Sequence, residues 1–529
     1  MSEPQAAAQA PRRIVPKPMD APLEPFIPRL RAHARARPDA VAVIDGARRL
    51  SWAELVDLID RVAARLAALG LGRGDVVATL GEGSAEHLAV YLGAIAAGAC
   101  AAPLPSGMRP EVLAAMLENA EARLLFATDA AMAQARAAAG AAPGCADAPV
   151  ALDALEDWLA GARAQDAPEA PAGLDDPFDM IFSSGTTGVP KGIEHDHKFR
   201  LRQLRRMALF GYGPDVVSIA STPLCSNTTL VAALPTLAEG GTLALMRKFD
   251  AEGFLRLAQA HRATHAMLVP VQYRRILDAP GFDAADLSSF RVKLSTSAPL
   301  PVALKREILA RWPGELIEIY GMTEGGLSTI LDCRAHPDKL HTVGRPAEGA
   351  DILIVDEEMR PLPPGEVGEI LGRSPMMMTW YRNAPDKTRE AIWRSPEGED
   401  WIRTGDMGRL DPDGFLELLD RRKDMIISGG FNVFAADLER ELLAHPDVAE
   451  AAVIGVPSRE WGETPLALVV PRAGARPDPE ALREWVNARL GKVQRISRIE
   501  LRESLPRSEI GKVLKRELRA PYWKEAAGG

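Results

Sequence analysis

The residues from Ser183 to Gly192 form the segment of this sequence with the clearest chemical character. They read Ser-Ser-Gly-Thr-Thr-Gly-Val-Pro-Lys-Gly. Small residues allow a polyphosphate to approach the backbone closely, so that successive N–H groups and hydroxyls donate to its oxygens. The Walker phosphate loop requires Gly-Lys followed by Ser or Thr, whereas Lys191 lies between Pro190 and Gly192. The segment therefore predicts a phosphate-binding loop of another kind, and the alternative is an ordinary flexible loop.

The segments around this loop predict alternating strands and helices. A buried strand, Asp179–Phe182, leads into the loop, and a helix with Leu201, Leu204 and Met207 at helical spacing follows it. Strands and helices alternate through one block up to about residue 172 and through a second from about 178 to 331. This alternation predicts parallel sheets that are covered by helices on both faces.

The chain changes character after His341. Short apolar segments bounded by Gly and Pro predict antiparallel or barrel-like strands at Asp351–Val355, Gly368–Leu371 and Phe415–Leu418. A charged turn at residues 420–424 precedes a smaller region, in which Asp478 before Pro479 predicts the start of a helix. We therefore predict an α/β fold. Its large N-terminal domain, residues 1–422, contains two parallel-rich α/β subdomains and a β-barrel-like subdomain, and a small α+β C-terminal domain spans residues 424–529.

The composition excludes some functional classes. The chain has 529 residues and a net charge of −9, without the basic surface typical of nucleic-acid binding. Its four cysteines are scattered, which favours a reducing compartment, interpreted as the cytoplasm. The longest apolar run, Ala89–Leu104, is shorter than the roughly 20 residues of a membrane span and predicts a core helix, a stop at Gly98 and a strand. The oligomeric state is not readable from the sequence.

The Ser183–Gly192 segment resembles the signature loop of the adenylate-forming (AMP-binding) superfamily, in its acyl-CoA and aryl-CoA synthetase branch. The other family motifs follow in the same order over about residues 25–520. The resemblance implies that Tyr320 stacks on adenine, Thr323 contacts a phosphate and Glu324 binds Mg²⁺, the metal ligand of the site. It also implies that Asp406 binds the ribose. The implied ATP-binding and AMP-binding residues are Ser183, Ser184, Gly185, Thr186, Thr187, Gly188, Lys191, Ser297, Ala298, Pro299, Tyr320, Gly321, Met322, Thr323, Asp406 and Arg421.

The resemblance also implies a mobile C-terminal domain. Lys423 occupies the hinge position, and Lys512 corresponds to the lysine that swings into the active site, where a cation would neutralise approaching negative charges. Ser428, Gly429 and Gly430 resemble the loop that lines the pantetheine tunnel of coenzyme A. Trp461 packs against CoA or, as an equal alternative, is a core residue. The implied catalytic residues are Lys512, Glu324, Thr323 and Lys191.

Two departures from the family pattern concern the acid substrate. Ser226 stands where many relatives have a histidine, and Asn227 stands where amino-acid-activating relatives have the aspartate that pairs with the substrate ammonium. A neutral amide cannot form that ion pair, so we predict a carboxylic acid without an α-amino group. The absence of a clear charge among the pocket positions favours a cyclic, aromatic or medium-chain apolar body. The predicted acid-pocket residues are Ser226, Asn227, Thr228, Val269 and Met322.

The expected activity is an AMP-forming acid–CoA ligase that uses ATP, Mg²⁺ and coenzyme A. The alternatives are an adenylating enzyme that loads a carrier protein and a non-catalytic nucleotide-binding protein on the same fold. Lys512 lies in a pattern that resembles an acetylation site, which implies a lysine acetyltransferase and deacetylase as partners. His195 and His197 are two residues apart and do not share a helix face, so we do not predict a metal site there.

Overall fold

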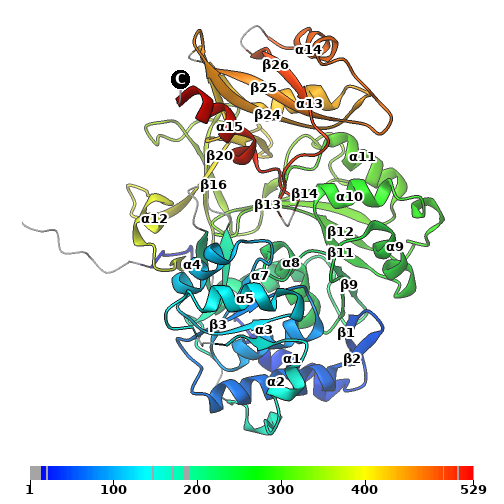
Figure 1. Cartoon of the computed structure of the whole chain (residues 1–529), viewed down its shortest axis with the longest axis vertical. Helices are drawn as coiled ribbons and strands as arrows, with labels where there is room; N and C mark the ends of the chain where they lie inside the picture. Colours follow the sequence, from blue (N-terminus) through cyan, green and yellow to red (C-terminus); the bar gives the residue numbers. More distant parts are fainter. Residues whose placement is uncertain are drawn as a thin grey trace, which may run out of the picture. The chain divides into compact units, whose positions relative to one another are not determined.

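The computed structural model describes residues 13–18, 22–145, 148–169, 172–183, 190–429, 431–491, 494–508 and 511–527 (Figure 1). The chain divides into two compact units. One comprises Met1–Ile352 and Gly372–Ile402, and the other comprises Leu353–Leu371 and Arg403–Gly529. No described helix is both long enough and apolar enough to cross a membrane.

A first sheet of the larger unit has the strand order β18-β8-β7-β4-β3-β5-β6. Its central strands are parallel, and their alternating side chains enter two separate cores. Val77, Ala101 and Phe126 pack with helices α2 (Trp52–Ala68) and α3 (Ala85–Ala96), whereas Ala78 and Ala102 pack with α4 (Pro110–Ala120) and α5 (Met132–Ala139). This confirms the prediction of a sheet covered on both faces. The strands are β3 (Val76–Leu80), β4 (Cys100–Leu104), β5 (Ala122–Ala127), β6 (Val150–Ala151), β7 (Pro177–Ser183), β8 (Lys191–Asp196) and β18 (Trp380–Tyr381).

The apolar run Ala89–Leu104 has the predicted structure. It contains the end of α3, then Gly98 at a φ of +83°, then β4. Glycine suits this position because side chains disfavour positive φ.

A second sheet of the same unit has the order β15-β14-β13-β12-β11-β9-β10-β1-β2. The run from β13 to β1 is parallel, so its strands end at one common edge. Figure 1 shows α9 (Ala251–Ala260), α10 (Pro270–Leu277) and α11 (Val302–Arg311) together beside β11 and β12. The strands are β1 (Val41–Asp45), β2 (Arg48–Ser51), β9 (Val217–Ala220), β10 (Thr242–Leu245), β11 (His265–Leu268), β12 (Val292–Ser295), β13 (Glu315–Gly321), β14 (Ser328–Asp332) and β15 (Arg345–Pro346).

The predicted strands after His341 are present and belong to a third sheet, with the order β16-β17-β20-β19 and with β21 also on β20. The long strand β20 changes partners along its length: residues 400–402 pair with β19, and residues 406–410 pair with β21. The elements are β16 (Asp351–Val355), β17 (Gly368–Arg373), α12 (Pro385–Glu390), β19 (Ile392–Arg394), β20 (Asp400–Leu410) and β21 (Leu416–Arg421).

The C-terminal part of the smaller unit is an α+β region with the order β23-β22-β25-β24 and with β26 on β25. Asp478 caps α14 as predicted, because its carboxylate accepts from the backbone N–H groups of Glu480 and Ala481. The elements are β22 (Ile426–Ser428), β23 (Phe431–Val433), α13 (Ala435–Leu443), β24 (Val448–Ser458), β25 (Gly462–Pro471), α14 (Pro479–Asn487), β26 (Arg498–Leu501) and α15 (Lys515–Ala527).

Candidate active site

The predicted phosphate loop is closed at its base by two paired strands. Ser183 ends β7 and pairs with Lys191, which begins β8. The predicted helix with Leu201, Leu204 and Met207 is α7 (His197–Ala208), and a strand that the sequence analysis did not predict, β8, lies between the loop and this helix because it pairs antiparallel with β7. The loop residues Ser184, Gly185, Thr186, Thr187 and Gly188 lie outside the described residues.

Tyr381 contacts both ends of the predicted phosphate and metal site. It lies in β18, which pairs with β8, so that its ring faces the Lys191 ammonium at 4.6 Å. Its hydroxyl donates to Glu324 Oε1 at 2.7 Å. Burial, and next the Glu324 carboxylate, raise the pKa of Tyr381 well above its ordinary value, so the phenol remains a donor. The sequence analysis assigned no role to Tyr381.

The turn after β13 is held from two sides. The Glu324 carbonyl accepts from the Met378 N–H at 2.8 Å. The Thr323 carbonyl lies 2.7 Å from Nε2 of His195, which comes from β8. Tyr320 and Gly321 end β13 itself. Met322 packs with Met377 and Met378 in one core cluster. Ligand loops of α/β folds are found at this carboxyl edge of parallel strands.

The turn that contains Ser297, Ala298 and Pro299 follows β12 at the same edge. Ser297 has a φ of +75°, in the region that favours glycine. Its hydroxyl is 2.6 Å from that of Thr228. This contact brings together a predicted nucleotide-binding residue and a predicted acid-pocket residue.

Three of the predicted acid-pocket residues, Ser226, Asn227 and Thr228, lie at the start of α8 (Asn227–Ala238). The Ser226 hydroxyl caps this helix by accepting from the Thr228 N–H at 3.2 Å. Serine at this position therefore has a local structural role that a histidine could not take in the same way. Asn227 is half-buried, and its Oδ1 accepts from Arg200 at 2.7 Å. Val269 is buried directly after β11.

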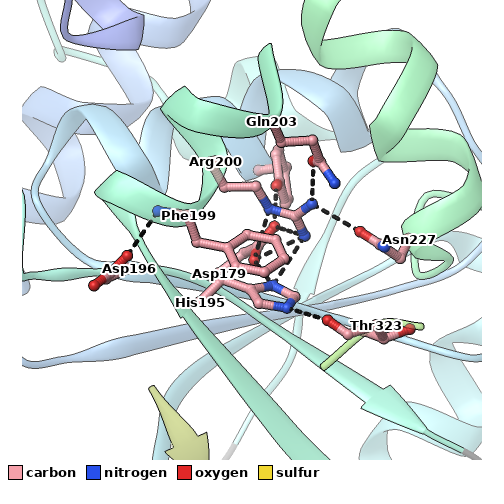
Figure 2. Close-up of polar contacts among 9 residues, drawn as sticks. Asp179, His195, Asp196, Phe199, Arg200, Gln203, Asn227 and Thr323 are labelled. Carbon is pink, nitrogen blue, oxygen red and sulfur yellow. Dashed lines mark hydrogen bonds and ion pairs between the residues drawn. The ribbon is translucent and has the colours of Figure 1, made fainter. Parts of the chain in front are cut away.

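Arg200 belongs to a fully buried polar network that the sequence analysis did not find (Figure 2). Arg200 and His195 both contact Asp179 of β7, and Tyr91 donates to Asp179 Oδ2 at 2.6 Å. Charged residues inside an apolar strand and on the buried face of a helix were the signal that could have indicated it.

His195, which belongs to this network, and His197 pack against different aromatic rings. His195 stacks on Phe199, and His197 packs edge-on against Phe178. Asp196, between them, caps α7 by accepting from the Phe199 N–H at 2.8 Å.

In the smaller unit, Asp406 and Arg421 are register partners on β20 and β21. Arg421 Nε lies 3.3 Å from Asp406 Oδ1. The predicted mobile lysine, Lys512, is in the same surroundings: burial and then Arg421 lower its pKa to about 8, against the opposing effect of Asp406. The same kinds of influence lower the pKa of the predicted hinge residue Lys423. These predicted residues therefore form one charged cluster.

The predicted CoA residues are adjacent to one another. Gly429 has a φ of +59°, and its N–H donates to the Trp461 carbonyl at 2.8 Å. A Cβ at Gly429 would lie 2.7 Å from the Trp461 ring, so only glycine fits. Trp461 is 51% exposed, which favours a surface contact over a core role. Ser428 ends β22, and Gly430 is outside the described residues.

Residues 30–382 match the family of AMP-binding enzymes, and residues 437–512 match the AMP-binding enzyme C-terminal domain. The chain is 34% identical to a feruloyl-CoA synthase of an Amycolatopsis species, over 92% of this chain and 97% of that protein. It is 33% identical to the fatty acid–[acyl-carrier-protein] ligase ScoC of Streptomyces coeruleorubidus, over 94% and 96%. The fold is similar to that of ATP-bound MatB from Rhodopseudomonas palustris, with a TM-score of 0.82 and 31% identity over 93% of this chain and 99% of that one. The chain therefore belongs to the AMP-binding enzyme family.

Proposed function

We propose that this protein is an AMP-forming acid–CoA ligase for a carboxylic acid without an α-amino group. The observation that carries the proposal is the convergence of Lys191 and Glu324 on Tyr381. A cation and a carboxylate held by one side chain, beside a small-residue loop, suit the phosphates of a metal-bound nucleotide. Similarity to acid–CoA ligases over nearly the whole chain supports the same reaction.

In the first step, a carboxylate oxygen of the acid attacks the α-phosphorus of ATP. The bond to pyrophosphate breaks, and an acyl adenylate forms. Lys191 and Thr323 bind phosphate oxygens, and Asp406 accepts from the ribose hydroxyls. Mg²⁺, when bound, neutralises phosphate charge. Glu324 suits it because hard cations prefer carboxylate oxygens, and the Tyr381 hydroxyl donates to Oε1 rather than to Oε2.

In the second step, the sulfur of CoA attacks the acyl carbon, the bond to AMP breaks, and the thiol proton is released to solvent. Rotation of the C-terminal domain about Lys423 separates the two steps, because Lys512 serves the first and the region of Ser428, Gly429, Gly430 and Trp461 serves the second. Lys512 neutralises the charges that approach one another in the first step.

Two finer proposals concern the cellular location of the protein and its regulation. A reducing, cytoplasmic location and acetylation of Lys512 by an acetyltransferase, reversed by a deacetylase, stay predictions. Acetylation would remove the cation and stop the first step.

A panel experiment tests the proposed function. Pyrophosphate release is measured with Mg·ATP and CoA for acetate, medium-chain acids, cyclohexanecarboxylate, benzoate, hydroxycinnamates and several amino acids. A CoA thioester from a cyclic, aromatic or medium-chain acid is the expected product. Turnover of amino acids alone would contradict the substrate class, and no turnover at all would favour a non-catalytic nucleotide-binding protein.

The second candidate function is loading of a carrier protein, which the similarity to ScoC favours. The same panel is therefore repeated with a phosphopantetheinylated carrier protein in place of CoA. Pyrophosphate release with transfer only to the carrier would support this alternative.

A further inference from the structure

The buried network around Asp179 joins two predicted parts of the active site that are far apart in the sequence (Figure 2). Asp179, His195 and Arg200 are completely buried. At one end of the network, His195 Nε2 is 2.7 Å from the Thr323 carbonyl. At the other end, Arg200 Nη1 is 2.7 Å from Asn227 Oδ1. One rigid set of side chains thus reaches the nucleotide turn and the acid pocket.

Asp179 is the charged centre of the network. It accepts from Arg200 Nη2 at 2.7 Å and from the Tyr91 hydroxyl at 2.6 Å, and it lies 2.8 Å from His195 Nδ1. Burial alone would raise the pKa of Asp179, but Arg200 and then His195 lower it to about 2. The carboxylate is therefore ionised at neutral pH. It holds the guanidinium through Nε and Nη2, whereas Nη1 faces Asn227.

The chemistry of the donors fixes the direction of two groups. A guanidinium only donates, so the Asn227 atom that it meets is the carbonyl oxygen and the amide NH₂ is at the other end. A backbone carbonyl only accepts, so His195 Nε2 carries a hydrogen toward Thr323. The N–H groups of the Asn227 amide therefore point away from Arg200.

Stability by itself is a weak reason for this network. Buried ion pairs often stabilise a fold no better than apolar side chains of similar volume. The network contacts the candidate active site. A role in that site accounts for buried charges that the stability of the core does not require.

We propose that Arg200 is a specificity-determining positioning residue: it turns the Asn227 amide so that its N–H groups donate to an acceptor oxygen of the acid substrate, and the Asn227 carbonyl oxygen, held by Arg200, is not presented to an α-ammonium. This inference rests on the proposed function and adds to it the substrate class, a carboxylic acid that presents a hydrogen-bond acceptor near position 227.

The first test is a double-mutant cycle on the KM for the acid that the wild type converts. Arg200→Lys and Asn227→Ala should each raise this KM about tenfold, the effect of one charge-assisted hydrogen bond, with little change in the KM for ATP. Because Arg200 acts through Asn227, the double variant should be no worse than Asn227→Ala alone. Multiplying effects on the acid KM would overturn the proposal.

The second test uses Asn227→Asp, which keeps the shape of the half-buried side chain. Arg200 should engage the new carboxylate, so this variant should not adenylate amino acids, whereas Asn227→Asp combined with Arg200→Gln should gain pyrophosphate exchange with them. Amino-acid adenylation by Asn227→Asp alone would refute the role of Arg200.

Two controls separate the possible failures. Lys293→Met removes a buried ammonium that is not part of the network. This ammonium donates to the carbonyls of Trp312 and Gly314, at the end of β12 away from the Ser297 turn. It should lower the unfolding temperature without changing the KM for the acid. A wild type that activates no acid would refute the proposed function. An active wild type, with an unchanged KM in Arg200→Lys, would refute only this inference.

Discussion

The hydroxyl of Tyr381 donates to Glu324 at 2.7 Å while its ring lies 4.6 Å from the Lys191 ammonium. One side chain thus supports both the predicted metal ligand and the predicted phosphate ligand. Neither contact could be inferred from residue spacing, because Tyr381 is 57 residues from Glu324 in the sequence.

Replacing Tyr381 with phenylalanine should separate these two contacts. Tyr381→Phe keeps the ring beside Lys191 and loses the bond to Glu324, so the Mg²⁺ concentration for half-maximal pyrophosphate exchange should rise about tenfold. Tyr381→Leu should also raise the KM for ATP, since it loses the ring. Tyr273→Phe is the matched control, because that hydroxyl donates to the Leu294 carbonyl inside the core. An unchanged Mg²⁺ dependence in Tyr381→Phe would show that the phenol does not position Glu324.

The role of Lys512 predicts a decline of adenylation at alkaline pH. Its pKa of about 8 is below the ordinary value, so the cation that the first step needs is lost as the pH rises through 8. The kcat/KM for adenylation, which reports the free enzyme, should therefore fall above about pH 8. Lys512→Arg should move this fall to higher pH, and Lys512→Ala should abolish adenylation while the unfolding temperature stays unchanged. Normal pyrophosphate release by Lys512→Ala would contradict the assignment.

Asp406 should bind the ribose hydroxyls of ATP. Asp406→Ala should raise the KM for ATP by about tenfold or more, and 2′,3′-dideoxy-ATP should be used equally well by the variant and the wild type. Glu417→Ala, which removes the nearby Arg409–Glu417 pair on the same two strands, is the control. Full discrimination between ATP and its dideoxy analogue in Asp406→Ala would assign the ribose to another residue.

The strained backbone of Ser297 predicts an unusual order of stability. Ser297→Ala loses the contact with Thr228 and keeps the positive φ, which should lower the free energy of unfolding by about 1 kcal/mol. Ser297→Gly loses the same contact but relieves the strain, so it should be more stable than Ser297→Ala. At Ala298, whose φ is not positive, glycine should instead destabilise. Urea unfolding measures all three variants, and an alanine variant more stable than the glycine variant at position 297 would contradict the strain.

Rotation about Lys423 remains a prediction. The contacts of this structure group residues 403–529 with residues 353–371. Crosslinking cysteines placed at Asp420 and Ala436 should lock the protein in the arrangement for the first step, because the Ala436 N–H donates to Asp420 Oδ2 at 3.3 Å across Lys423 and both Lys512 and Asp406 stay intact. The locked protein should release pyrophosphate in a single turnover and form no CoA thioester. Steady thioester formation by the locked protein would show that no rotation is needed.

Local patterns in the sequence were sufficient for much of this protein. The order of the motifs predicted the family. The apolar run with Gly98 and the helix cap at Asp478 predicted where elements begin and end, because turns, caps and periodicity depend on neighbouring residues. The strand β8 was missed, since its place is set by pairing with β7 rather than by its own pattern.

Which distant side chains meet depends on the tertiary structure. It brought Tyr381 to Glu324, Arg200 to Asn227 and Ser297 to Thr228. Pairing of β18 with β8, packing of α7 against α8 and the common edge of the parallel strands create these contacts, and hydrogen bonds at 2.6–2.7 Å between buried or half-buried groups define their direction. The motifs thus determined the type of chemistry, whereas the packing of the strands determined the residues that position it.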